Sequence, residues 1–326
     1  MFLRYALTIR RVVLGALLLA AAHAGAQTYQ DRPVRLLVTS PPGGANDIQA
    51  RTIGVRLSEY FGQQLVIDNR GGASGMIAAE IVARAPPDGY TLLAGTNSTF
   101  AVNPTLFPAV PYDTLRDFAM VSVTTTTPHV LLVHASIAAR TVPELIALAR
   151  AQPGKLNYAS SGSGSAFHLG MELLKATAGI QVVHVPFKGS ALSASAMLAG
   201  DVQLMLVGLP TGMSLAKSGK ARALAVANPK RSALVPELPT IAEAGVLGFG
   251  YDSWFGTVAP ARAPRPIITR LHESYARALA QPDVRERLAQ QGYDVISDTP
   301  AQMAARIREE TKKWAKVIRD SGAKPE

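Results

Sequence analysis

Cysteine is absent from all 326 residues. The chain therefore has no disulfide, no thiolate metal site, no thiol nucleophile and no lipid anchor attached through cysteine. Aromatic residues make up only 6% of the chain and charged residues only 17%, whereas 48% of the residues are hydrophobic. This apolar content is enough for packed cores and excludes a disordered chain. No apolar run reaches the roughly 20 residues that a membrane-spanning helix needs, and the length predicts about two domains.

The N-terminal segment has the order of features that marks a secreted protein. Residues 1–11 contain three arginines and no acid, and an apolar run at 12–22 and the small residues at 24–26 follow. A basic segment, a short apolar segment and an A-x-A site predict a signal peptide over residues 1–26. We therefore expect a periplasmic protein, exported with a cleavable signal peptide.

Basic residues outnumber acidic ones, 33 to 23, and the formal charge is +10. Three of the arginines belong to the predicted signal peptide, and the remaining Lys and Arg residues are scattered along the chain. There is no basic block interleaved with aromatic residues, so we expect no nucleic-acid partner.

Strand-like and helix-like segments alternate along the rest of the chain. The apolar run at 34–38 predicts a strand, and apolar residues at helical spacing between Ala50 and Phe61 predict the helix after it. Near the C-terminus, Thr299 and Gln302 predict a capping box at the start of a long helix. The alternation predicts an α/β protein with mainly parallel sheets flanked by helices, in which ligands bind at the carboxyl ends of the strands.

Four loops join predicted strands to predicted helices and could hold an anion. They cover residues 41–47, 95–99, 160–168 and 185–190, and they are rich in glycine, hydroxyl and amide groups. Glycine permits close approach of the backbone, and the free N–H groups of a helix N-terminus suit a carboxylate or a phosphate. None of the loops matches a nucleotide P-loop, a dinucleotide-binding fingerprint or a nucleophile elbow. Each is also compatible with an ordinary capped turn, His168 with a buried histidine and Lys188 with a solvated lysine.

The remaining chemistry-bearing residues show no metal-binding spacing. The histidines form no H-x-H or H-E-x-x-H motif, and no carboxylate cluster resembles a metal site. We expect no metal and no cofactor. Serine, histidine and aspartate are all present, which leaves open a secreted α/β serine hydrolase that uses Ser163 or Ser161 with His168.

Taken together, the motifs resemble those of one family, the extracytoplasmic solute receptors of tripartite tricarboxylate transporters, often called Bug receptors. The resemblance covers essentially the whole chain after the signal peptide. Its marks are residues 33–38 followed by PPGG at 41–44 and Asp47, NRGGASG at 69–75, PDGYTL at 87–92, YD at 112–113 with DF at 117–118, SGSG at 161–164 with HL at 168–169, and HVPFKG at 184–189. The sequence departs from the family pattern in having Phe187 where tyrosine is common and Phe167 before His168.

The resemblance implies a two-lobed periplasmic-binding-protein fold of type II-like topology, with the ligand cleft between the lobes. Lobe 1 would be discontinuous, over 28–126 and 228–326, and lobe 2 would cover 127–227. The residues expected to bind the ligand are Pro42, Gly43, Gly44, Asp47, Thr96, Asn97 and Ser98 on one wall, and Ser161, Gly162, Ser163, Ser165, His168, Lys188 and Gly189 on the other.

The resemblance also implies a function. The protein would be a monomeric receptor without enzymatic activity that captures a small carboxylate and delivers it to membrane transporter subunits. Besides the serine hydrolase, one further alternative stays open, a subunit that presents its ligand to a membrane sensor kinase.

Overall fold

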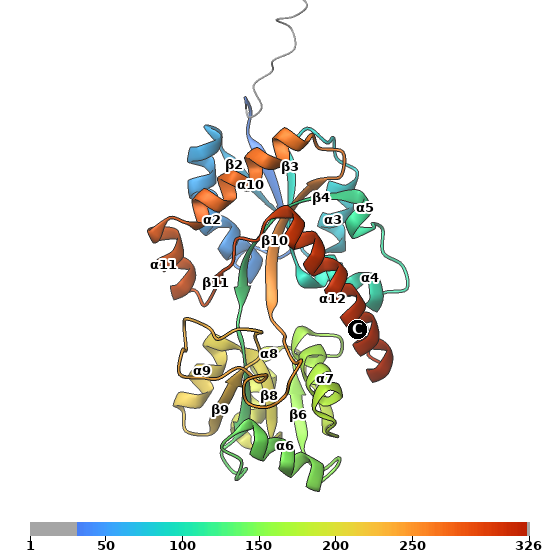
Figure 1. Ribbon diagram of the computed structural model, residues 1–326, viewed down its shortest axis with the longest axis vertical. Coiled ribbons are helices and arrows are strands. Elements are labelled where there is room, and N and C mark those ends of the chain that lie inside the picture. Colours follow the sequence, from blue (N-terminus) through green and yellow to red (C-terminus); the bar gives the residue numbers. More distant parts are fainter. Residues whose placement is uncertain (1–30, 325–326) are drawn as a thin grey trace, which may run out of the picture.

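The structure, a computed structural model, describes residues 31–324. The predicted signal peptide lies outside the described residues. Within this range the chain forms two β-sheets, one above the other in Figure 1, and helices flank each of them. The predicted two-lobed α/β architecture is confirmed.

The first sheet has six strands in the order β11-β4-β10-β3-β1-β2. Its strands are β1 (Val34–Val38), β2 (Leu65–Asn69), β3 (Thr91–Thr96), β4 (Phe118–Thr127), β10 (Ser253–Pro260) and β11 (Asp294–Val295). The helical segments of this part of the chain are α2 (Ala45–Phe61), η1 (Ala73–Gly75), α3 (Met76–Ala83), η2 (Ser98–Val102), α4 (Asn103–Leu106), α5 (Thr114–Asp117), α10 (Arg265–Leu279), α11 (Pro282–Gln290) and α12 (Pro300–Ser321).

The second sheet has five strands in the order β7-β6-β8-β5-β9. They are β5 (His129–His134), β6 (Asn157–Ser160), β7 (Val183–Pro186), β8 (Leu204–Gly208) and β9 (Ala221–Val226). The helices of this part are α6 (Val142–Ala151), α7 (Ala166–Ala178), α8 (Ser190–Ala199) and α9 (Leu209–Lys217).

Both sheets are mixed, whereas the sequence predicted mainly parallel ones. The parallel pairs are β1 with β2 and β3, and β6 with β7 and β8. The antiparallel pairs involve the strands that connect the sheets: β10 runs against β3 and β4, and β5 runs against β8 and β9. The antiparallel pairing follows from the route of the chain. β10 enters the first sheet from the second sheet, so it runs opposite to β3 and β4, which point towards the second sheet.

The same topology turns the carboxyl ends of both sets of parallel strands towards each other. β4 runs in the direction of β1, β2 and β3, and it passes into β5 through Pro128 alone. β5 leads away from this crossing, so β6, β7 and β8 point back towards it. Loops at the carboxyl ends of α/β strands are where ligands bind. The region between the two edges is therefore the expected place for a site.

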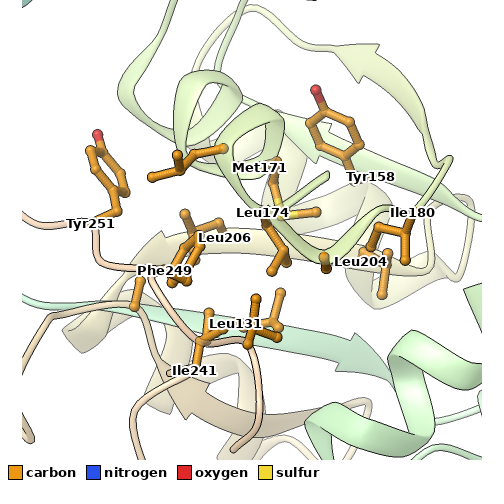
Figure 2. Packing of buried hydrophobic residues seen from close by; sticks show 14 of the residues in the cluster. Leu131, Tyr158, Met171, Leu174, Ile180, Leu204, Leu206, Ile241, Phe249 and Tyr251 are labelled. Atoms are coloured by element: carbon orange, nitrogen blue, oxygen red, sulfur yellow. The ribbon is translucent and has the colours of Figure 1, made fainter. Parts of the chain in front are cut away.

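Two segments far apart in the chain complete the core of the second sheet. Ile241 and Phe249 follow β9, and Figure 2 shows them packed with Leu131 of β5 and Leu206 of β8. Trp314, Val317 and Ile318 of α12 belong to the same buried cluster. α12 begins at the predicted capping box of Thr299 and Gln302 and also packs against β4 of the first sheet. The lobe boundaries expected at 126/127 and 227/228 stay a prediction, and residues 241–251 pack on the second sheet.

The first residue of β5, His129, is buried at the crossing between the sheets. Its ring is only 3% exposed and packs against Phe167 and Tyr251, with ring centroids 5.5 and 5.0 Å away. Nδ1 has no hydrogen-bond partner among the described residues. Burial lowers the pKa of His129 to about 4, from the ordinary value of 6.5.

We expect His129 to make the protein sensitive to acid. Between pH 6.5 and 4 the unfolded chain protonates this ring and the folded chain does not, so stability that is present above pH 6.5 is lost as the pH falls. At pH 5 the difference in protonation of His129 lowers the free energy of unfolding by about 2 kcal/mol. Urea unfolding at pH 8 and pH 5 should therefore show a smaller acid loss for His129→Phe than for the wild type. An equal loss in both proteins would contradict the assignment.

Candidate functional site

A cavity of about 370 Å³ lies at the carboxyl ends of the parallel strands of the first sheet. Among the residues that the structure describes, none of those lining it is charged. Most of the polar lining groups are hydroxyls, asparagine amides and glycine backbone. The lining residues are Thr39, Ser40, Ala45, Asn46, Gly72, Ser74, Gly75, Thr96, Asn97, Ser98, Ser253 and Phe255. All of them lie on the side of the first sheet, and none comes from the loops at 160–190.

The cavity wall around η1 is held in a constrained backbone conformation. Ala73 and Ser74 have φ values of 45° and 51°, which side-chain-bearing residues rarely adopt. At Gly75 a Cβ atom would lie 2.7 Å from Thr99 Oγ1 and 2.9 Å from Thr39 Cβ. Asn103 Nδ2 donates a hydrogen bond to Ser74 O at 3.0 Å. This wall is therefore preformed, with its polar groups already oriented.

Buried amide side chains tie the remaining walls together. Asn46, at the start of α2, donates to Thr39 Oγ1 at 2.9 Å and to Ala94 O at 2.7 Å. Asn97 is 3% exposed and donates to Asp252 O at 3.5 Å. The N-terminus of α2 and the turn after β3 are thus fixed to the sheet that they flank.

The loop before α2 supports the cavity from behind. Asp47 accepts hydrogen bonds from Gly43 N at 2.8 Å, Arg51 Nε at 2.9 Å and Asn69 Nδ2 at 2.9 Å. Burial raises the pKa of this carboxyl, but the bonds from Arg51, Gly43 and Asn69 outweigh burial and hold the pKa below its ordinary value. The Asp47 carboxylate thus stays ionised, and its oxygens are already hydrogen-bonded to groups of the protein. Of the candidates on this wall, Thr96, Asn97 and Ser98 line the cavity, whereas Pro42, Gly43, Gly44 and Asp47 do not.

The loops of the second sheet bring the other candidates together. Ser165 is the N-cap of α7, and its Oγ accepts the His168 amide at 3.3 Å. Gly189 N donates to Ser161 O at 3.3 Å, which joins the loop before α8 to the loop before α7. Lys188 is exposed and forms no ion pair within residues 31–324. Ser161, Gly162, Ser163, Ser165, Lys188 and Gly189 thus belong to one surface formed by the two loops, and the contact of these residues and of His168 with a ligand stays a prediction.

His168 lies beneath this surface and holds it in place. It is 6% exposed, and its Nδ1 accepts the Gly164 amide at 2.9 Å. Its ring stacks on His184 at 4.0 Å and on Tyr158 at 6.5 Å. His184 Nε2 lies 2.6 Å from Ser160 Oγ at the end of β6. Burial, and after it the neighbouring His168, lower the pKa of His184 to about 4, so the His184 ring is uncharged near neutral pH.

Several lining residues carried no signal in the sequence. Ser253 and Phe255 reach the cavity because β10 pairs with β3, which places Phe255 opposite Thr96. This pairing joins residues far apart in the chain, and no local pattern reveals it. Gly72, Ser74 and Gly75 could have been found, because the run NRGGASG already marked the family.

Two absences hold for residues 31–324. None of their helices is both long and apolar enough to cross a membrane. No group of three or more His, Asp or Glu side chains among them could hold a metal ion.

Comparison with known proteins identifies the family. Residues 49–323 match the model of the tripartite tricarboxylate transporter family receptor. A UPF0065 protein encoded between tcbD and tcbE in Pseudomonas sp. strain P51 is 40% identical, over 95% of this chain and 93% of that protein. Protein BugT of Bordetella pertussis is 36% identical, over 93% of this chain and 94% of that protein.

Solved structures agree. An R. palustris protein solved with adipate is 39% identical, with a TM-score of 0.74 over 91% of this chain and 99% of that one. The protein MatC from Rhodopseudomonas palustris, solved with bound malate, is 33% identical, with a TM-score of 0.69 over 88% and 99%. Because both the family model and these relatives span nearly the whole chain, the protein belongs to the tripartite tricarboxylate transporter receptor family, whose members are periplasmic solute-binding receptors.

Proposed function

We propose that this protein captures a small carboxylate between its two sheets and delivers it to the membrane subunits of a tripartite transporter. The observation that carries the proposal is the uncharged, donor-rich cavity at the carboxyl ends of β1 and β3, which face those of β6 and β7. Relatives solved with adipate and with malate support a carboxylate as the ligand.

Neutral groups suffice to hold such an anion. Hydrogen bonds from amides and hydroxyls to a carboxylate are charge-assisted and stronger than those between neutral partners. The helices α2, α7 and α8 also begin at the facing edges, and the N-terminal end of a helix favours negative charge. The ligand would therefore be bound by Thr96, Asn97 and Ser98 from one side and by the loop at 161–165 from the other.

Closure of the two lobes would bury the ligand. Two segments cross between the sheets, one at Pro128 and one following β9, and they are bonded to each other. His129 N donates to Asn228 Oδ1 at 3.2 Å, and Ala227 N donates to His129 O at 2.8 Å. The crossing at Pro128 is a single residue and is bonded to the start of the other segment, residues 227–252, which makes it a suitable hinge because few residues need to change their backbone angles.

We propose binding without catalysis. The Nδ1 atom of His168 already accepts an amide hydrogen bond, and its ring is enclosed by His184 and Tyr158. The nearest carboxylate, Glu172, accepts hydrogen bonds from Tyr158 Oη at 2.5 Å and Lys175 Nζ at 2.6 Å. This arrangement supports a loop and is poorly suited to a general base. We also propose that the receptor acts as a monomer in the periplasm after cleavage of residues 1–26.

The test is calorimetric titration of the mature protein with adipate, malate and adipamide, an uncharged counterpart of adipate. Binding of at least one of the acids at one molecule per chain, without binding of adipamide, is the expected result. A fluorophosphonate probe should leave Ser161 and Ser163 unlabelled. Stoichiometric labelling of either serine, or the absence of binding across a wider panel of small carboxylates, would overturn the proposal.

A further inference from the structure

A second cavity, of about 540 Å³, lies outside the site described above. It is formed by the segment from η2 to α5 on one side and by α12 on the other. Phe100, Phe107, Val110, Leu115 and Ile307 give it apolar walls. Its volume falls within the range of about 300–1,000 Å³ that is typical of small-molecule sites.

Two cations on α12 give this cavity a positive rim. Arg308 and Lys312 are exposed, lie one helical turn apart and line the cavity. Neither side chain forms an ion pair or hydrogen bond with another residue of the described range 31–324. The one acid among the described lining residues, Asp113, accepts hydrogen bonds from Leu115 N and Arg116 N, both at 3.0 Å. The lining side chains thus carry two positive charges and one negative charge, so a net positive charge borders an apolar interior.

We propose that this cavity is a second ligand site, which binds an amphipathic monocarboxylate such as an aromatic or medium-chain acid. The apolar body of the ligand lies against Phe107, Val110 and Ile307. The carboxylate is bound by Arg308 and Lys312 at the rim. The cavity is concave and of ligand size, which favours a small molecule over a protein segment as its occupant.

The experiment compares phenylacetate with benzyl alcohol and benzylamine, which share the ring and differ in charge, by NMR titration of the mature protein. Phenylacetate should bind more tightly than either of the others. The double substitution Arg308→Glu and Lys312→Glu should weaken phenylacetate binding about tenfold, because it reverses two charges at the rim. The control is Arg319→Glu, which reverses one charge on the same helix outside the cavity, and it should leave the affinity unchanged.

Three results would overturn the proposal. The first is absence of saturable phenylacetate binding to the wild type. The second is equal binding of benzyl alcohol and phenylacetate, which would leave only an apolar surface of the kind that a protein side chain contacts. The third is binding that is insensitive to the double substitution but lost in Ser163→Trp, which would place the acid in the cleft.

Discussion

Replacing Trp314 by alanine should lower the free energy of unfolding by about 4 kcal/mol, as is typical for the loss of a large buried aromatic side chain. Trp314 is 1% exposed and belongs to the buried cluster of the second sheet. Its ring meets Tyr251 edge to face, with centroids 5.3 Å apart. Trp314 is among the largest fully buried side chains of the described residues, so the cavity left behind would be large.

The indole nitrogen of Trp314 also belongs to a cluster of buried hydrogen-bonded side chains, with Glu310 and Trp254. It donates to Glu310 Oε2 at 3.4 Å, while Trp254 Nε1 donates to Glu310 Oε1 at 2.8 Å. Burial raises the pKa of Glu310, and this effect outweighs the opposing effects of Lys313, Trp254 and Arg306. Truncation at Trp314 would remove one of its two indole donors, which adds to the cost of the cavity.

The measurement is urea unfolding at pH 7.5, followed by circular dichroism. Trp314→Phe keeps most of the ring and should cost about 1–2 kcal/mol, mainly through the lost N–H bond and volume. Arg319→Ala, on the exposed face of the same helix, should change stability by less than about 0.5 kcal/mol. A loss below 1 kcal/mol for Trp314→Ala would show that α12 is not part of the second core.

Replacing Ser163 by tryptophan should weaken carboxylate binding at least a hundredfold, which corresponds to about 2.7 kcal/mol. Ser163 lies between Gly162 and Gly164, whose φ values of 133° and 75° hold the loop at the edge that faces the first sheet. An indole there would occupy the space between the two lobes and cover the amides around it. The loss would thus come from blocked access and blocked closure together.

The substitution should leave the fold intact, because Ser163 is only partly buried and the loop is anchored by Ser165 and His168. The matched control is Ser136→Trp, in the turn after β5 at the opposite edge of the second sheet, which should bind like the wild type. Calorimetry with the acid that the wild type binds best provides the readout, and thermal unfolding checks the fold. Unchanged affinity in Ser163→Trp would remove the loop at 161–165 from the site.

Local signals in the sequence predicted much of the architecture. The capping box of Thr299 and Gln302 appears where the sequence placed it. The direction of the connecting strands was not predictable in the same way, because β5 and β10 look like any other apolar strand. Their antiparallel pairing depends on the route of the whole chain, which no short window of residues contains.

The residues of the candidate site likewise divide into those that local sequence signals revealed and those that they did not. The loops with Thr96 and with Ser161 were recognisable from glycine and hydroxyl residues beside predicted strands. Phe255 was not, because it reaches Thr96 only through the pairing of β10 with β3. For His168 the residues alone allowed either a ligand contact or a buried role. In the structure His168 is buried and stacks on His184. This contact joins two different strand–helix units, so the residues near His168 in the sequence do not reveal it.

The position of α12 at the end of the chain affects when the protein can fold. Synthesis proceeds from the N-terminus, so the strands of the second sheet leave the ribosome well before Trp314, Val317 and Ile318, which pack into their core. Until this C-terminal segment emerges, the buried cluster that also contains Leu131 and Leu206 lacks these three side chains. The nascent chain therefore spends most of its synthesis with an unfinished core, and the last contacts to form are among the longest in range.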